Sequence, residues 1–145
     1  MITCNGNGGL DTMAIGVDKR MRVLSRLPKE DAAFIRAYTE RYPHVLHYTS
    51  LHVLHCFVDN KAKTYFLVGL DEKPIRYPAH EDFLMAKRIM AAAMKEHVNE
   101  LAIEIDTLEM DVPSLIDGLL YRNYEFTHYK TDAKSTTVRN INLIT

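Results

Sequence analysis

The sequence predicts an α/β fold with a mixed central sheet that is covered by helices on both faces. Helical and strand patterns alternate along the chain, and two extended segments in its middle are joined by a turn signal typical of a hairpin. A long helical stripe is then followed at once by a short strand, which indicates a crossover back into the same sheet. The 145 residues suit a single domain around one core.

The N-terminal segment is expected to be a flexible lead-in over residues 1–17, because residues 1–16 carry four of the six glycines. Residues 18–24 alternate loosely and predict a short first strand. The next element is a helix that begins near Pro28, a residue suited to a first helical turn, and ends at Pro43. The apolar face predicted for this helix consists of Ala33, Phe34, Ala37 and Tyr38.

Three segments rich in Val, Leu, Tyr and Phe follow and predict strands at residues 45–50, 51–58 and 64–70. Residues 59–61 read Asp-Asn-Lys, a turn signal between the last two segments. The sequence therefore predicts a β-hairpin here.

The clearest helical spacing in the sequence lies at residues 80–97. Residues 101–105 alternate as a short strand directly after it. The buried stripe predicted for the helix consists of Phe83, Ala86, Met90, Ala93, Met94 and His97.

Residues 106–111 are expected to form a loop, after which Pro113 opens a helix with Asp111 available as its cap. Residues 136–145 then form either a terminal strand or a tether. The inner side of the helix, which is expected to run to about Arg122, is predicted to carry Leu115, Leu119 and either Leu120 or Arg122.

Charge and hydropathy exclude several classes of protein. With 18 Lys and Arg against 19 Asp and Glu the net charge is −1, so the chain has no general attraction for nucleic acid or anionic lipid. The longest apolar runs are six residues, against about 20 for a membrane-spanning helix, and the N-terminus lacks the pattern of a secretory signal. We therefore expect a cytoplasmic protein whose Cys4 and Cys56 are free thiols.

The histidines invite a metal interpretation, since His44-x-x-His47 and His52-x-x-His55-Cys56 lie close together in the sequence. Residues three apart on a strand point to opposite faces, however, so neither pair converges on one ion without a bend. His44 and His52 can still approach each other across neighbouring strands. A structural role is the preferred interpretation, and no metal ligand is predicted in this chain.

Catalytic motifs are absent from the sequence: there is no G-x-S-x-G elbow, no phosphate-binding G-x-x-x-x-G-K-[ST] loop and no H-E-x-x-H helix. Cys56 falls inside a predicted strand, where a thiol is buried rather than activated. The sequence predicts no catalytic and no cofactor-binding residue.

Two polar clusters and one glycine-rich loop have an alternative interpretation. Glu104, Asp106, Glu109 and Asp111 surround the end of a strand, where a divalent cation or a solvated loop would fit, and the solvated loop is preferred. The basic patch of Lys19, Arg20, Arg22 and Arg26 lacks interleaved aromatic residues and is interpreted as a solvated face. The loop around Gly8 and Gly9 resembles the glycine-rich loop of macro domains, which bind ADP-ribose, although a flexible lead-in explains the same glycines.

Residues 115–132, LIDGLLYRNYEFTHYKTD, resemble the end of the N-terminal domain of leucyl (cytosol) aminopeptidases. In that family a helix carries an acidic residue followed by a glycine. Asp117-Gly118 takes this place here, whereas the acidic residue of the family is more usually glutamate. An aromatic pair, Tyr124-x-Phe126, and then Tyr129-Lys130 follow, as at the exit of that helix. The order of elements from about residue 18 onward is compatible with the same domain.

This resemblance implies a three-layer α/β/α, macro-like domain at residues 18–145, which in complete enzymes precedes a larger catalytic domain. That catalytic domain holds two metal ions, zinc or manganese, through the motif types G-K-x-x-T-F-D and N-T-D-A-E-G-R, and both are absent here. No catalytic residue is therefore carried over. The chain is therefore either an excised portion of a longer enzyme or a stand-alone relative with another role. It ends at Thr145, about where the connection to a catalytic domain would begin, which favours excision.

The leading functional hypothesis is a non-catalytic N-terminal domain of a leucyl aminopeptidase-type metallo-exopeptidase, acting in assembly or in access to the active site. Its expected partners are the C-terminal catalytic domain of the same polypeptide and further copies in a hexamer. Two alternatives remain: a macro-type ligand-binding module that uses Gly8 and Gly9, and a nucleic-acid-contacting accessory domain that uses the Lys19–Arg26 patch.

Overall fold

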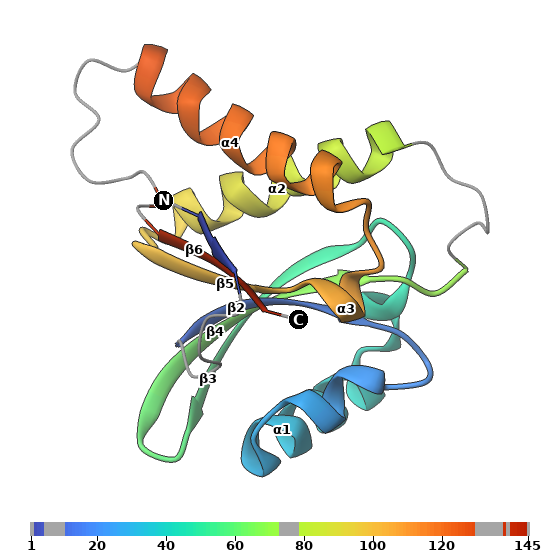
Figure 1. The fold of residues 1–145 in the computed structure, drawn as a ribbon. Helices are drawn as coiled ribbons and strands as arrows, with labels where there is room; N and C mark the ends of the chain where they lie inside the picture. Colours follow the sequence, from blue (N-terminus) through green and yellow to red (C-terminus); the bar gives the residue numbers. More distant parts are fainter. Residues whose placement is uncertain (1, 5–10, 73–78, 130–137, 139, 145) are drawn as a thin grey trace.

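The computed structural model describes residues 2–4, 11–72, 79–129, 138 and 140–144; of residues 2–4, 79 and 123–129 it describes the backbone path alone. They form the predicted α/β fold, with a mixed sheet between helices on both faces (Figure 1). The strands are β1 Ile2–Cys4, β2 Thr12–Val17, β3 Leu51–Val58, β4 Lys61–Gly69, β5 Glu100–Glu104 and β6 Asn140–Ile144. The α-helices are α1 Lys29–Arg41, α2 Ala79–Lys95, α3 Ile105–Leu108 and α4 Val112–Tyr129, and two 3-10 helices are η1 Arg22–Arg26 and η2 Pro43–Leu46.

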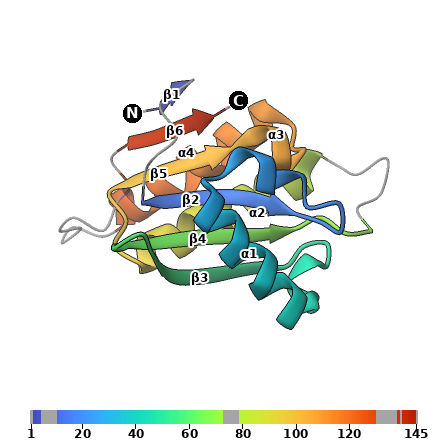
Figure 2. The ribbon, with the colours of Figure 1, turned by 90° about the horizontal axis from the view of Figure 1, so that it is seen from below.

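The sheet has the strand order β1-β6-β5-β2-β4-β3. Only the β3–β4 pair is antiparallel among these strands, and every other neighbouring pair is parallel. Helix α1 covers one face, whereas α2 and α4 lie together on the other (Figures 1 and 2). The predicted three-layer architecture is therefore confirmed.

The central strand β2 corrects the expectation of a flexible lead-in over residues 1–17. Residues 12–17 pair with both β4 and β5, and residues 2–4 pair with β6 at the sheet edge; residues 5–10 lie outside the described part. Ala14 packs into the core beneath α2 and α4, while Ile15 and Val17 pack into the core beneath α1. Because both faces are buried, the strand shows no alternation that would reveal it in the sequence.

Several other boundaries differ from the prediction. Residues 18–24 do not form a strand, because the chain leaves the sheet after Val17 and turns into η1. Residues 45–50 are not a strand either, since η2 ends at Leu46 and the sheet resumes at Leu51. Residues 105–108 form the short helix α3 within the expected loop.

The hairpin, α2 and β5 are confirmed. Asp59 and Asn60 both have positive φ angles, 53° and 62°, as a two-residue type I′ turn requires. Helix α4 begins where predicted, and the Asp111 carboxylate accepts the Ser114 amide at 3.1 Å as a cap. It extends to Tyr129, beyond the expected end, and the last segment forms strand β6 rather than a tether.

Helix α1 is attached to the sheet by a buried carboxylate, which corrects its predicted apolar face. Asp31 is 1% exposed; its Oδ2 lies 2.9 Å from the Lys63 Nζ and accepts the Tyr65 hydroxyl. Burial, followed by the bond to Asp31, raises the pKa of Tyr65, so this hydroxyl stays a donor. The helix therefore turns Asp31, Ile35 and Thr39 inward and leaves Ala33, Phe34 and Ala37 exposed.

Helices α2 and α4 pack closely because of Gly118. A Cβ atom at this position would lie 2.4 Å from the Phe83 carbonyl oxygen of α2. Leu115 and Leu119 are fully buried against the same helix pair, whereas Leu120 is exposed. Among the described residues, no helix is both long enough and apolar enough to cross a bilayer.

We predict that Gly118→Ala lowers the free energy of unfolding by about 1–3 kcal/mol, because the helices must separate to admit the methyl group. An ordinary Gly→Ala change inside a helix would instead stabilise it by about 1 kcal/mol. Urea unfolding followed by circular dichroism measures the difference. Asp117→Ala, at an exposed neighbouring position on α4, is the control and should leave stability nearly unchanged; a stabilised Gly118→Ala variant would contradict the packing argument.

Candidate functional site

The carboxyl ends of the parallel strands β2, β4 and β5 lie at one edge of the sheet, where ligands of open α/β sheets bind. Val17 ends β2, Gly69 ends β4 and Glu104 ends β5. The polar side chains that follow these strands determine what this edge can do.

An ion-pair cluster occupies the β2–β5 part of the edge. Arg22 of η1 lies 2.8 Å from Asp18 and 2.9 Å from Glu109. The hydrogen bonds to Asp18 and then to Glu109 raise the pKa of Arg22, and partial burial opposes this shift without cancelling it. Arg26 lies 3.3 Å from Glu104 and 3.1 Å from Asp106. The basic patch and the acidic cluster predicted separately from the sequence therefore meet and neutralise each other.

The remaining members of both clusters lie elsewhere. Asp111 caps α4, and its backbone amide donates to Asp82 Oδ2 at 2.8 Å. Lys19 donates its backbone amide to Asp71 Oδ1 at 2.9 Å, and Arg20 is exposed beside it.

Glu104 is the most buried acid of the cluster, at 3% exposed. Burial raises the pKa of its carboxyl, and the nearby Arg26 opposes this shift without cancelling it. The backbone at this point is fixed by Thr107, whose hydroxyl donates to the Glu104 carbonyl and accepts the Gly16 amide, each at 3.1 Å. The cluster thus ties η1, α3 and β2 together.

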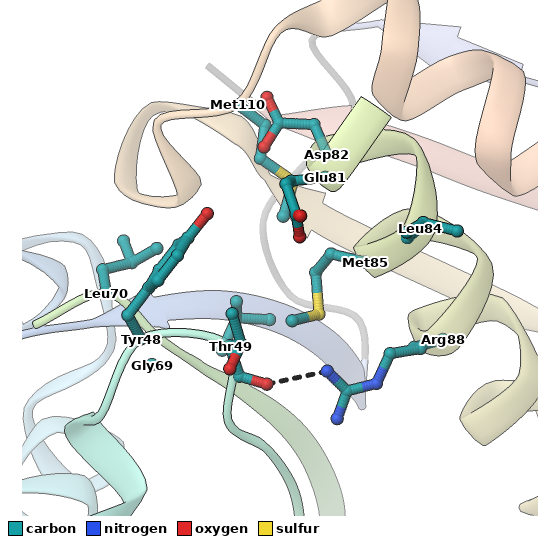
Figure 3. Close-up of a pocket in the computed structure, with 11 residues that line it drawn as sticks. Tyr48, Thr49, Gly69, Leu70, Glu81, Asp82, Leu84, Met85, Arg88 and Met110 are labelled. Carbon is teal, nitrogen blue, oxygen red and sulfur yellow. Dashed lines mark hydrogen bonds between the residues drawn. The ribbon is translucent and has the colours of Figure 1, made fainter. Parts of the chain in front are cut away.

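A cavity of about 170 Å³ lies on the other part of the edge, between the end of β4, the η2–β3 loop and the first half of α2 (Figure 3). In Figure 3 the Tyr48 hydroxyl and the Glu81 carboxylate point into this space. Arg88 donates to the Thr49 carbonyl oxygen at 2.7 Å and so holds the loop against α2. The apolar part of the lining consists of Val68, Leu70, Leu84, Met85 and Met110.

The loop that closes this cavity is strained at Thr49, which has a φ angle of 71°. A β-branched residue rarely adopts this left-handed conformation, and such strain concentrates at functional sites. Sequence reasoning missed the cavity, because its lining comes from four separate segments that carry no shared motif.

The histidines do not converge on one site. His44 and His52 do approach, with ring centroids 5.3 Å apart, as the sequence allowed. Burial, and then the charge of His44, lowers the pKa of His52. His55 Nε2 instead lies 3.3 Å from Glu96, and His97 is exposed at the end of α2 rather than on its buried stripe.

Among the described residues, no group of three or more His, Cys, Asp or Glu side chains is placed to hold a metal ion. Cys56 is a buried free thiol whose pKa is raised by burial, which makes it a poor nucleophile. Gly8, Gly9, Lys130 and the side chains of Cys4, Tyr124, Phe126, His128 and Tyr129 lie outside the described part.

No protein-family model matches the sequence, and no curated protein matches it. A solved structure does match the fold: a mutant of tomato leucine aminopeptidase, with a TM-score of 0.69 at 11% sequence identity. The match covers 99% of this chain and 32% of the tomato chain, so this chain spans about a third of the length of that protein. The resemblance inferred from residues 115–132 is confirmed at the level of the fold, and the matched share is consistent with the N-terminal domain of the tomato enzyme.

The raised pKa of Glu104 predicts a specific pH dependence. Because the folded state holds this proton more tightly than the unfolded state, the contribution of Glu104 to stability is full below the ordinary glutamate pKa of 4.5. It is lost as pH rises through the raised pKa. We expect the stability of the wild type minus that of Glu104→Gln to fall between pH 4 and neutrality in urea titrations.

Glu40→Gln, at an exposed position on α1, controls for the loss of one glutamate. If the difference between wild type and Glu104→Gln instead increased with pH, pairing with Arg26 would outweigh burial and the electrostatic account of the cluster would be wrong.

Proposed function

We propose that this chain is a non-catalytic accessory domain of a leucyl aminopeptidase-type metallo-exopeptidase, and that it contributes to assembly or to access to the active site. The observation that carries the proposal is the fold match over 99% of this chain to a third of tomato leucine aminopeptidase. The aromatic and acidic-glycine pattern of residues 115–132 supports the same family, and Gly118 lies where α4 packs closely against α2.

The residues at the carboxyl edge do not fit a two-metal centre. Such a centre needs several carboxylates free to bind cations, whereas Glu104 and Asp106 lie within ion-pair distance of Arg26 and Glu109 pairs with Arg22. Zinc or manganese therefore belongs, in this proposal, to the catalytic domain that follows in the parent enzyme. Hydrolysis of the peptide bond takes place there.

The ion pairs also bear on the nucleic-acid alternative. Arg22 and Arg26, two of the four cations in the Lys19–Arg26 patch, are engaged with carboxylates of the same chain. A phosphate would have to displace these partners, so the patch offers less charge than its sequence suggests. The accessory role is the better supported function.

We predict that the purified chain does not release nitroaniline from leucine p-nitroanilide, with either zinc or manganese supplied. The residues that would hold the ions and the attacking water are expected in another domain. A complete leucine aminopeptidase assayed in parallel is the positive control. Turnover that is saturable and abolished by a chelator would contradict the accessory role.

The positive side of the proposal is tested on the parent gene and its product. The reading frame is expected to continue past Thr145 into a segment with the lysine and carboxylate ligands of a two-metal site. Deletion of residues 1–145 from that product should change its oligomeric mass in light scattering or its Michaelis constant for peptides. A stop codon directly after Thr145 would overturn the assignment.

A further inference from the structure

Strand β3 is an edge of the sheet, and no described residue bonds to its outer side. It lies at the opposite end of the sheet from β1 (Figure 2). Val58 and Lys61 flank the two-residue turn and so form a hydrogen-bonded pair, and the Ser50 carbonyl oxygen accepts the Gly69 amide at 2.9 Å. Bonded residues alternate along an antiparallel ladder. The N–H and C=O groups on the open side therefore belong to Leu51, Val53, His55 and Phe57.

This edge lacks the features by which proteins prevent edge strands from pairing. Those features include proline, charged side chains, bulges and a very short strand. β3 is eight residues long, LHVLHCFV, and contains no proline and no Lys, Arg, Asp or Glu. Its register with β4 runs without a bulge from Leu51–Val68 to Val58–Lys61. The strand therefore presents an unbroken row of donors and acceptors to another strand.

Phe57 gives a second and independent reason to expect a partner at this edge. Its side chain is 70% exposed, the highest value among the large hydrophobic residues that the structure describes as exposed. Alternation places it on the same face as Leu51 and Val53, which pack against the core beneath α2 and α4. A single exposed aromatic residue needs no explanation by itself, but this one lies on the strand with the open edge. A second apolar strand would cover it.

We propose that β3 pairs with β3 of a second copy of this chain, antiparallel about a two-fold axis, so that two sheets join into one. In this register Leu54 lies at the axis, opposite Leu54 of the second copy. Val53 then lies opposite His55, and Leu51 opposite Phe57, so all four open residues are paired. A shift of the register by two residues in either direction leaves one of the four unpaired. Pairing of identical strands also closes the assembly at a dimer.

The charges favour a second copy as the occupant. β3 carries no Asp, Glu, Lys or Arg, so its pairing with itself brings no like charges together. Just beyond the strand, the register places Asp59 of each copy opposite Thr49 of the other. The Thr49 carbonyl oxygen accepts the exposed Arg88 at 2.7 Å. A carboxylate and a guanidinium therefore approach each other at both ends of the interface.

The interface consists mainly of one strand from each copy, which is less than a stable dimer of standard size buries. We therefore expect a weak dimer, with a dissociation constant of about 100 µM. This assignment does not rest on the accessory role, because both strands belong to this chain.

Sedimentation equilibrium of the whole chain, at concentrations below and above this value, measures the dimer. Amide hydrogen exchange followed by NMR then identifies the surface. The amide of Cys56, which bonds to β4, should exchange slowly at every concentration. Exchange should become several-fold slower at high concentration for the open-side amides, those of Leu51, Val53, His55 and Phe57.

A matched pair of variants locates the interface. Phe57→Lys should weaken dimerisation at least about tenfold, because the two-fold axis removes the aromatic contact twice and a lysine protects an edge strand. Ala62→Lys adds the same charge at an exposed position directly opposite Phe57, but on β4, one strand in from the edge. It should leave dimerisation unchanged. Asp59→Asn, which the turn tolerates, should weaken dimerisation about twofold to fivefold.

The proposal is overturned if the chain stays monomeric at high concentration, which would leave the edge to a strand of another protein. It is equally overturned if a dimer forms without slower exchange at the open-side amides, or if Phe57→Lys and Ala62→Lys weaken dimerisation equally. Each of these outcomes is independent of whether the parent protein is a peptidase.

Discussion

The burial of strand β2 on both of its faces is the constraint on which the rest of the structure depends. β2 pairs with β4 on one side and β5 on the other, so its alternate side chains need a covering layer above and below the sheet. Helix α1 supplies one layer, and α2 with α4 supplies the other. Gly16 makes the arrangement possible at the strand end, since a Cβ there would lie 2.3 Å from the Thr107 carbonyl oxygen of α3.

This placement of β2 also divides the carboxyl edge into two unlike parts. On the β5 side, η1 and α3 are brought within ion-pair distance, and their charges satisfy each other. On the β4 side, the chain passes through the η2–β3 loop, which is joined to α2 by the bond from Arg88 to the Thr49 carbonyl oxygen. The first part is closed by its own salt bridges, and the second contains the cavity.

The sequence predicts those elements whose pattern is local. The spacing of α2 and the Asp59–Asn60 turn are readable because one helix stripe and one two-residue turn each lie within a short window. β2 was not predicted, because a strand buried on both faces does not alternate and glycines precede it. The face of α1 was wrong because Asp31 reads as a solvated acid until Lys63 and Tyr65, more than thirty residues later, are brought to it.

The same distinction applies to the candidate sites. The acidic cluster and the basic patch were each found from composition, but their pairing depends on η1, an element with no clear signal in the sequence. Nothing local marks Thr49 for a positive φ angle, so the wall of the cavity was not predictable either. The resemblance noted over residues 115–132 is confirmed at the level of the fold, whereas the close approach at Gly118 is made against Phe83 and Ala86 of α2, a distant segment that the local pattern does not identify.

A shared fold at 11% identity leaves the chemistry of this chain to be decided by its own side chains. On the β5 side the carboxylates are already neutralised, and any ligand there would have to break a salt bridge before it gained a contact. On the β4 side the buried Asp82 already accepts the Asp111 backbone amide, and Arg88 already donates to the Thr49 carbonyl oxygen. In both parts of the edge, therefore, charged side chains first serve to hold the elements of this chain together.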